Sequence, residues 1–147
     1  MIRNQKGMTL IELIMVLLLM GIIGSSITVG SRMLQEMTLK AKAHEVVTGL
    51  EYVKQSAVAT GELYNVCCFE HKIYVRKGIE KAAYIIRLGD GIRVPKDITG
   101  RLIQFNGTMA PRDGAATIKL VDDRLKKQVR ITVGVGTGKI RVYYEAL

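Results

Sequence analysis

The sequence has few of the side chains that enzymes most often use for catalysis. Its 147 residues include only two histidines, His44 and His71, and two cysteines, Cys67 and Cys68. No serine or cysteine lies in a recognisable nucleophile motif, where a base would activate it. The sequence therefore predicts no catalytic residues and a protein that is not an enzyme.

The positions of the two cysteines limit what they can do. Cys67 and Cys68 are adjacent, so they cannot cross-link distant segments, and we expect packing to hold the fold together. Glu70 and His71 follow closely and add two more metal-binding residue types. On an extended strand, however, Cys67 and His71 would be roughly 13 Å apart at about 3.3 Å per residue. A turn at Glu70 would shorten that distance, but a metal site needs three or four convergent ligands. We expect a buried or edge thiol pair, with no metal and no cofactor.

A glycine-rich segment, residues 134–138, resembles a phosphate-binding loop only superficially. No Gly-Lys-Ser/Thr closes it, and a strand rather than a helix is expected after it. The segment is therefore predicted to be a hairpin connection.

Acidic residues are scarce relative to basic ones. Thirteen Asp and Glu stand against 22 Lys and Arg, which gives a formal net charge of +9. This excess favours nonspecific attraction to anionic lipid or nucleic acid. Composition by itself does not choose between the two.

Charge is absent from residues 13–30, a stretch of 18 residues that is mostly Leu, Ile, Met and Val. This is about the length that a helix needs to span the apolar core of a bilayer. Arg3 and Lys6 precede the stretch, and Arg32 follows it. The positive-inside bias then predicts a single-pass protein of the inner (cell) membrane, with a cytoplasmic N-terminus and the bulk of the chain outside.

Two simpler interpretations of this stretch leave observations unexplained. A cleavable secretory signal usually has an apolar run of roughly 7 to 15 residues and an A-x-A-like site, and neither is found here. A plain membrane anchor does not account for Glu12, because a charged group near the centre of a membrane helix costs roughly 2.5 to 3.5 kcal/mol unless it has a partner. Cleavage after Gly7 would create an amine at Met8, which could meet Glu12 at i, i+4 in the same chain or in a neighbouring one.

The segment KGMTLIE, residues 6–12, followed by the long apolar run, resembles the class III signal of type IV pilins and pseudopilins. In that family, prepilin peptidase cuts after the glycine and methylates the new N-terminus, and the glutamate serves filament assembly. The resemblance implies cleavage between Gly7 and Met8, N-methylation of Met8, and an assembly role for Glu12 as a registry device. The family usually has Phe where this chain has Met8. The implied partners are prepilin peptidase, other pilin or pseudopilin subunits and the inner (cytoplasmic) membrane.

Beyond Arg32 the hydrophobic pattern is that of an amphipathic helix followed by strands. Val46, Leu50, Val53 and Ala57 form one apolar helical stripe, and Gly61 is a plausible stop for a helix of about fifty residues. After it the period changes to two, for example at residues 72–76, 116–120 and 128–133, with turn-rich stretches between. We expect an α+β fold in which one long helix packs on an antiparallel sheet of about six or seven strands.

The predicted organisation has four parts. Residues 1–7 form the leader peptide, residues 8–31 the transmembrane and filament-core helix, residues 32–60 the amphipathic half of the helix, and residues 61–147 the β-rich part of the pilin domain.

Three short motifs in the β-rich part refine the resemblance. F-x-G at residues 105–107, G-x-x-T-I-x-L at 114–120 and G-[KR]-[IV]-R-V at 138–142 occur in the order seen in the GspH/FimT group of minor pilins and pseudopilins. The resemblance implies a structural subunit of a type IV pilus, a type II secretion filament or a competence filament, and then an extracytoplasmic location within that filament. Residues 63–93 resemble no family motif.

Alternation along the last strands predicts that Lys119, Arg130, Lys139 and Arg141 face outward. A solvated face that keeps the domain soluble is one interpretation of these charges. The alternative is DNA binding during uptake, because some FimT-like minor pilins bind DNA through a basic Gly-Arg-x-Arg motif. This chain has Lys139 at the first basic position, and lysine neutralises phosphate without the bidentate geometry of arginine.

Overall fold

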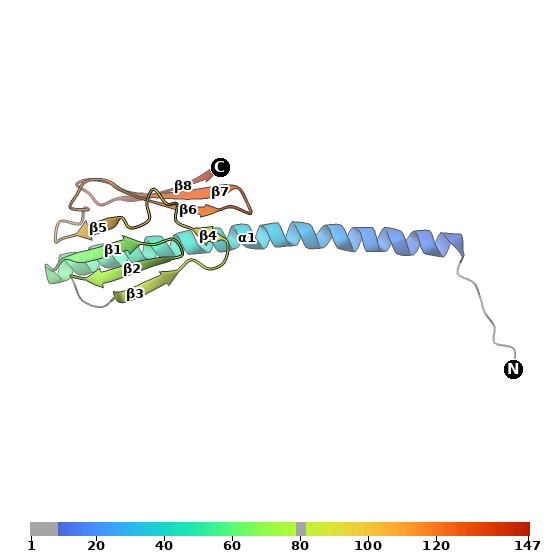
Figure 1. Ribbon diagram of the computed structural model, residues 1–147, viewed down its shortest axis with the longest axis horizontal. Helices are drawn as coiled ribbons and strands as arrows, with labels where there is room; N and C mark the ends of the chain where they lie inside the picture. The colour runs from blue at the N-terminus through green and yellow to red at the C-terminus, as the bar shows by residue number, and fades with distance from the viewer. Residues whose placement is uncertain (1–8, 79–81) are drawn as a thin grey trace, which may run out of the picture. The chain divides into compact units, whose positions relative to one another are not determined.

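The computed structural model describes residues 9–78 and 82–147, with the side chains of residues 25–29 left aside (Figure 1). The chain divides into two compact units, residues 1–35 and 36–147. A single helix, α1 (Leu10–Thr60), contributes to both units. The predicted leader, together with Gly7 and Met8, lies outside the described residues.

Backbone hydrogen bonds define both ends of helix α1. At its start, the Thr9 carbonyl accepts hydrogen bonds from the backbone N–H groups of Glu12 and Leu13, both at 3.1 Å. At its end, the N–H of Gly61 donates to the Ala57 carbonyl at 3.0 Å, and Gly61 has a φ of +68°. Glycine adopts this left-handed conformation without steric cost, so the predicted stop at Gly61 is confirmed.

The C-terminal half of α1 buries one face. The predicted stripe of Val46, Leu50, Val53 and Ala57 is confirmed, since each is at most 2% exposed. Their spacing of three and four residues keeps them on one side of the helix, where they join the core of the second unit.

Among the described residues of the second unit, eight strands form two four-stranded antiparallel sheets. The N-terminal sheet has the order β3-β2-β1-β5, and the C-terminal sheet has the order β4-β6-β7-β8. The strands of the N-terminal sheet are β1 (Tyr64–Cys68), β2 (Lys72–Lys77), β3 (Ala82–Arg87) and β5 (Leu102–Phe105). Those of the C-terminal sheet are β4 (Ile92–Arg93), β6 (Ala116–Asp122), β7 (Lys127–Val133) and β8 (Ile140–Ala146).

The predicted α+β class is confirmed, and the strand count and sheet arrangement differ from expectation. About six or seven strands in one sheet were predicted, whereas residues 9–78 and 82–147 contain eight strands in two sheets. Strand β4 has only two residues, which is too short to show a period. Strand β3 is apolar on successive residues, so it does not alternate clearly.

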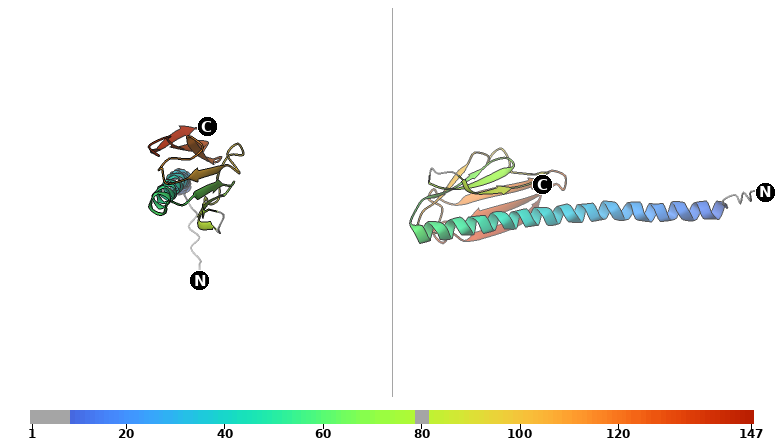
Figure 2. Two further views of the ribbon diagram at one scale, coloured as in Figure 1. Left: turned by 90° about the vertical axis from the view of Figure 1, so that its left-hand side faces the viewer. Right: turned by 90° about the horizontal axis from the view of Figure 1, so that it is seen from below.

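The core lies where the inner faces of both sheets meet α1. Figure 2 shows the C-terminal half of the helix running along the two sheets. Ile73 and Ile86 contribute from the N-terminal sheet, and Ile118 and Ile131 contribute from the C-terminal sheet. Burial on these inner faces leaves the outer face of each sheet free to carry polar or functional side chains.

Candidate functional site

Glu12 lies in the first turn of α1 with its side chain exposed. Its carboxylate has no hydrogen bond or ion pair to any of residues 9–78 and 82–147. A helix N-terminus favours a nearby negative charge through its backbone N–H groups. The side chain is therefore well placed for a partner outside the described chain.

The same part of α1 presents an almost uninterrupted apolar surface. Its large hydrophobic side chains are between 48% and 78% exposed, and they are Leu10, Ile11, Leu13, Ile14, Met15, Leu17, Leu18, Leu19, Met20, Ile22 and Ile23. These residues surround the helix on all sides, and a helix that is apolar all round is normally covered by other helices or by lipid. Nevertheless, no helix in the described ranges meets the length and apolarity required to cross a bilayer.

A groove on the outer face of the C-terminal sheet is lined by three of the four predicted basic residues. In the strand register, Lys119 lies opposite Arg130, and Arg130 lies opposite Tyr143. Arg130, Lys139, Arg141 and Tyr143 line a shallow groove of about 450 Å³ beside the β7–β8 connection. We call this the basic groove.

The four cations differ in how strongly they are already engaged. The Lys119 ammonium pairs with Asp97 at 3.3 Å and does not line the basic groove. Arg130 pairs with Glu145, and its guanidinium lies 5.2 Å from the centroid of the Tyr143 ring. Lys139 and Arg141 are exposed, and neither forms an ion pair with a described residue. These two have the most charge available for a ligand.

Tyr143 also lies on this face and was not among the residues predicted from the sequence, although strand alternation indicates its position. Ile140 and Val142 are half-buried and pack against the core, so strand alternation places Arg141 and Tyr143 outward together.

Gly138 sets the position of Lys139. Residues 134–138 connect β7 to β8, which confirms the predicted hairpin connection. Gly138 has a φ of +59°, and a Cβ atom there would come within 1.9 Å of the Met109 carbonyl oxygen. The Lys54 ammonium also donates to the Gly138 carbonyl at 3.3 Å. Only glycine fits here, which gives a physical reason for the glycine that opens the G-[KR]-[IV]-R-V motif.

The two cysteines are free thiols on successive positions of β1. Cys68 is buried, and burial raises the pKa of its thiol to about 12, with the neighbouring Cys67 adding to the effect. Cys67 is half-buried on the opposite face of the strand. Within the described ranges, no three Cys, His, Asp or Glu side chains converge as metal ligands would.

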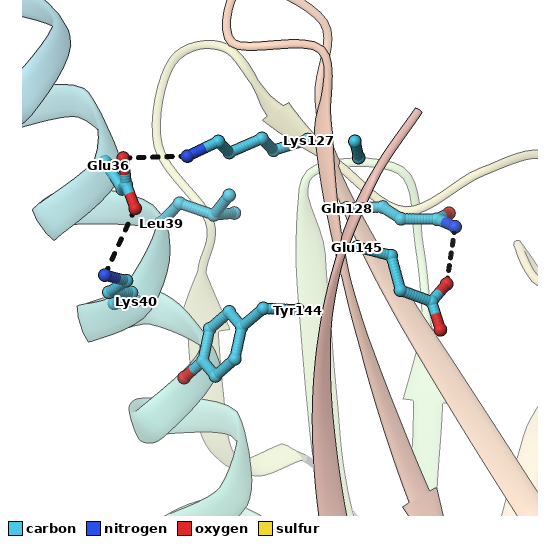
Figure 3. A pocket seen from close by; sticks show the side chains of 8 residues that line it. Glu36, Leu39, Lys40, Lys127, Gln128, Tyr144 and Glu145 are labelled. Atoms are coloured by element: carbon cyan, nitrogen blue, oxygen red, sulfur yellow. Dashed lines mark hydrogen bonds and ion pairs between the residues drawn. The ribbon is translucent and has the colours of Figure 1, made fainter.

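A second cavity, of about 420 Å³, lies between α1 and the β7–β8 strands (Figure 3). On its rim the Glu36 carboxylate accepts hydrogen bonds from Lys127 at 2.8 Å and from Lys40 at 3.1 Å. The Lys127 bond, with Lys40 beside it, holds the pKa of Glu36 below its usual range. The Glu36–Lys40 spacing is visible in the sequence, but the contact with Lys127 is not. This ion-paired bridge ties the helix to the start of β7.

Comparison with known proteins gives two matches that agree with each other. Residues 2–28 match the prokaryotic N-terminal methylation motif. The fold is similar to that of the type IV minor pilin FimU of Pseudomonas aeruginosa strain PAO1, in a crystal structure, with a TM-score of 0.55 and 13% sequence identity. That similarity covers 71% of this chain and 92% of the FimU chain. No curated protein sequence matches this one.

Proposed function

Starting from a type IV pilin-like fold that carries an N-terminal methylation motif, we propose that this chain is a minor pilin or pseudopilin. In this proposal it is a structural subunit of a filament rather than an enzyme. The observation that carries it is the overlap of the methylation motif at residues 2–28 with the exposed apolar surface of helix residues 10–23. Exposed apolar surfaces of this size are normally buried in contacts with other molecules, and the equivalent helices of neighbouring subunits would bury this one.

The proposal assigns a role to each residue of the N-terminal signal. Prepilin peptidase cuts between Gly7 and Met8 and methylates the new Met8 amine. That amine is four residues before Glu12, so it can pair with Glu12 of its own chain or of the next subunit. The absence of any partner for Glu12 among the described residues supports this assignment. A charged pair that forms only in one alignment of apolar helices would set the register of the filament.

Before assembly, residues 8–31 would hold the subunit in the cytoplasmic membrane with its N-terminus inside. The flanking cations Arg3, Lys6 and Arg32 favour that orientation. The GspH/FimT-like motifs at residues 105–107, 114–120 and 138–142 favour a minor subunit of a pilus, type II secretion or competence filament.

The direct test is processing. The chain is expressed with a prepilin peptidase, and the mature protein is examined by intact-mass and N-terminal peptide mass spectrometry. We expect loss of residues 1–7 and one added methyl group on Met8. A chain cut near Gly30, or one that keeps its N-terminus in the presence of active peptidase, would contradict the proposal. A Gly7→Asp variant serves as the uncleaved control.

DNA binding is the second candidate function, and the basic groove is the observation that favours it. Lys139 and Arg141 are exposed and unengaged by described residues, and they share the groove with Arg130 and Tyr143. Cations that neutralise phosphates beside an aromatic ring are a common arrangement at nucleic-acid surfaces. The two functions are compatible, because a filament subunit can display a DNA-binding face. The salt dependence of duplex DNA binding tests this candidate.

A further inference from the structure

The outer face of the N-terminal sheet carries an apolar row that the filament proposal does not use. The strand register places Leu102 opposite Cys67, Cys67 opposite Tyr74, and Tyr74 opposite Ile85. Side chains in direct register lie on the same face of a sheet, so the row crosses all four strands. Their neighbours along the strands, such as Val66 and Ile103, point inward and are buried. The row therefore faces away from the core.

This row is exposed and is extended at one end by an aromatic pair. Leu102 is 45% exposed and Ile85 is 41% exposed. Phe69, which is also 45% exposed, packs edge-to-face on Tyr74 with ring centroids 5.3 Å apart. We call Leu102, Cys67, Tyr74, Ile85 and Phe69 the outer apolar row. Contiguous exposed apolar side chains rimmed by polar residues are typical of interaction sites.

The charged side chains on the outward face of these four strands are all cationic. Lys72 and Arg76 share the outward face of β2 with Tyr74, and Arg87 shares that of β3 with Ile85. None of these three cations forms an ion pair with a described residue, whereas Lys54, Lys77, Arg93 and Lys127 elsewhere all do. No Asp or Glu occurs in the four strands of this sheet. Among the residues that the structure describes, the outward face of these strands therefore combines an apolar centre with cations that have no ion-pair partner.

Arg76 also carries an unmet hydrogen-bonding group. Its Nε atom is buried and has no hydrogen-bond partner among the described residues. Asn65, directly opposite Arg76 in the register, likewise has a buried Oδ1 without a partner. Buried polar atoms are normally paired, so a partner for either atom lies outside the residues that the structure describes.

We propose that this face docks a different protein, through a surface with an apolar centre and a carboxylate rim. Carboxylates would pair with Lys72, Arg76 and Arg87 while apolar side chains cover the row. A second copy of this chain fits poorly, because a two-fold contact would oppose like charges. Nucleic acid fits poorly as well. The Phe69 and Tyr74 rings pack against each other, Arg76 lies 5.8 Å from the Tyr74 ring, and the rest of the row has no ring on which a base stacks. The inference does not depend on the filament proposal.

Cys67 provides a reporter inside the proposed site. It lies in the middle of the row and is half-buried, while Cys68 is buried on the opposite face of the strand. The sequence contains no other cysteine. Alkylation by a maleimide therefore reports on Cys67, and a molecule that covers the row slows it.

The experiment uses the full chain in mild detergent and three labelled synthetic peptides of equal length. One alternates Glu with Phe, one alternates Glu with Ser, and one alternates Lys with Phe; an oligo-dT strand is the fourth probe. We expect the Glu/Phe peptide to bind at least about tenfold more tightly than the other probes and to slow Cys67 alkylation. The double variant Leu102→Gln with Ile85→Gln should lose this preference, and Arg76→Gln with Arg87→Gln should weaken binding and its salt dependence. Lys96→Ala with Arg112→Ala removes two exposed cations outside this sheet and should leave binding unchanged.

Three results would overturn the proposal. The first is equal binding of all three peptides, or of none. The second is Glu/Phe binding that leaves Cys67 alkylation unchanged, which places the peptide elsewhere. The third is oligo-dT binding that is stronger than peptide binding and is lost with the Arg76 and Arg87 variant, which would make the face a nucleic-acid site. Circular dichroism confirms that each variant keeps its fold, and all substituted side chains are outward-facing.

Discussion

Gly138 lies against the backbone of Met109, so closely that a methyl group at position 138 would come within 1.9 Å of the Met109 carbonyl oxygen. Both residues have positive φ angles, +59° and +62°. This contact joins the β7–β8 connection to the loop that precedes β6. It also positions the start of β8, and with it Lys139 and Arg141 of the basic groove.

Replacing Gly138 with Ala should destabilise the second unit. The left-handed conformation costs a residue with a Cβ atom roughly 1–2 kcal/mol, and the collision with Met109 adds to this. We expect a total loss of roughly 2–4 kcal/mol in the free energy of unfolding, measured by urea denaturation. Gly136→Ala is the matched control, because Gly136 has a φ of +78° but no atom within 4 Å of its Cβ position. If both variants lose the same free energy of unfolding, the backbone at Met109 moves aside without energetic cost and the close contact does not contribute.

Replacing Glu12 with Ala should reduce incorporation into filaments. The loss of one partner of a pair buried between helices costs about 3–5 kcal/mol, so a decrease of at least tenfold is expected. Membrane insertion should be intact or improved, because a charge is removed from an apolar helix. The measurement compares subunit in sheared filaments with subunit in membranes by immunoblot.

Glu51→Ala is the control for this prediction, because Glu51 is a helix carboxylate that pairs locally with Lys54. Incorporation of the Glu12 variant at the level of the wild type and of this control would refute the assembly role of Glu12.

Replacing Lys139 and Arg141 with Ala should weaken duplex DNA binding and its dependence on salt. Each phosphate contact that is lost lowers the slope of log K against log salt by about 0.9, so a decrease of roughly two is expected. The effect should not depend on base sequence. Folding should change little, because both side chains are exposed.

The charge-matched control is Lys96→Ala with Arg112→Ala, which removes one lysine and one arginine outside the basic groove. This control is compared directly with the Lys139 and Arg141 variant. If both show the same decrease in DNA affinity and in the slope of log K against log salt, binding depends on net charge and not on the basic groove. If the wild-type chain binds no DNA at low salt, the four cations are an ordinary solvated face.

Breaking the bridge between Glu36 and Lys127 should alter the dependence of stability on pH. The folded-state pKa of Glu36 is lowered, chiefly by the hydrogen bond from Lys127. Its stabilising contribution is therefore fully present above the usual pKa of 4.5 and is lost as pH falls through the lowered value. Lys127→Met should lower Tm at neutral pH, and only slightly, because exposed ion pairs contribute little to stability. In acid, where Glu36 is protonated, the variant and the wild type should have the same Tm.

The matched comparison is Lys42→Met, which removes a lysine that pairs with Glu45 within α1 and not with a strand. A Lys127 variant with the same Tm difference at every pH would show that Lys127 acts by packing instead of charge.

Local patterns in the sequence were sufficient to predict the helix and the N-terminal signal. The stripe of Val46, Leu50, Val53 and Ala57 follows the 3.6-residue period of one buried face, and Gly61 stops the helix because glycine adopts a positive φ without steric cost. The isolated charge of Glu12 within an apolar run is likewise a local signal. Each of these depends on neighbours within a few turns of the chain.

Only the tertiary structure decided which strands pair and which side chains meet. Strand β5 joins β1, and the two-residue β4 leaves its neighbours in sequence to join β6. Register then brings Tyr143 beside Arg130, and aligns Leu102 with Cys67. Alternation says which side chains share a face of one strand but not which strand lies beside it, because pairing is chosen by burial of the whole core. Contacts such as Glu36 to Lys127, 91 residues apart, follow from that choice and not from any local pattern.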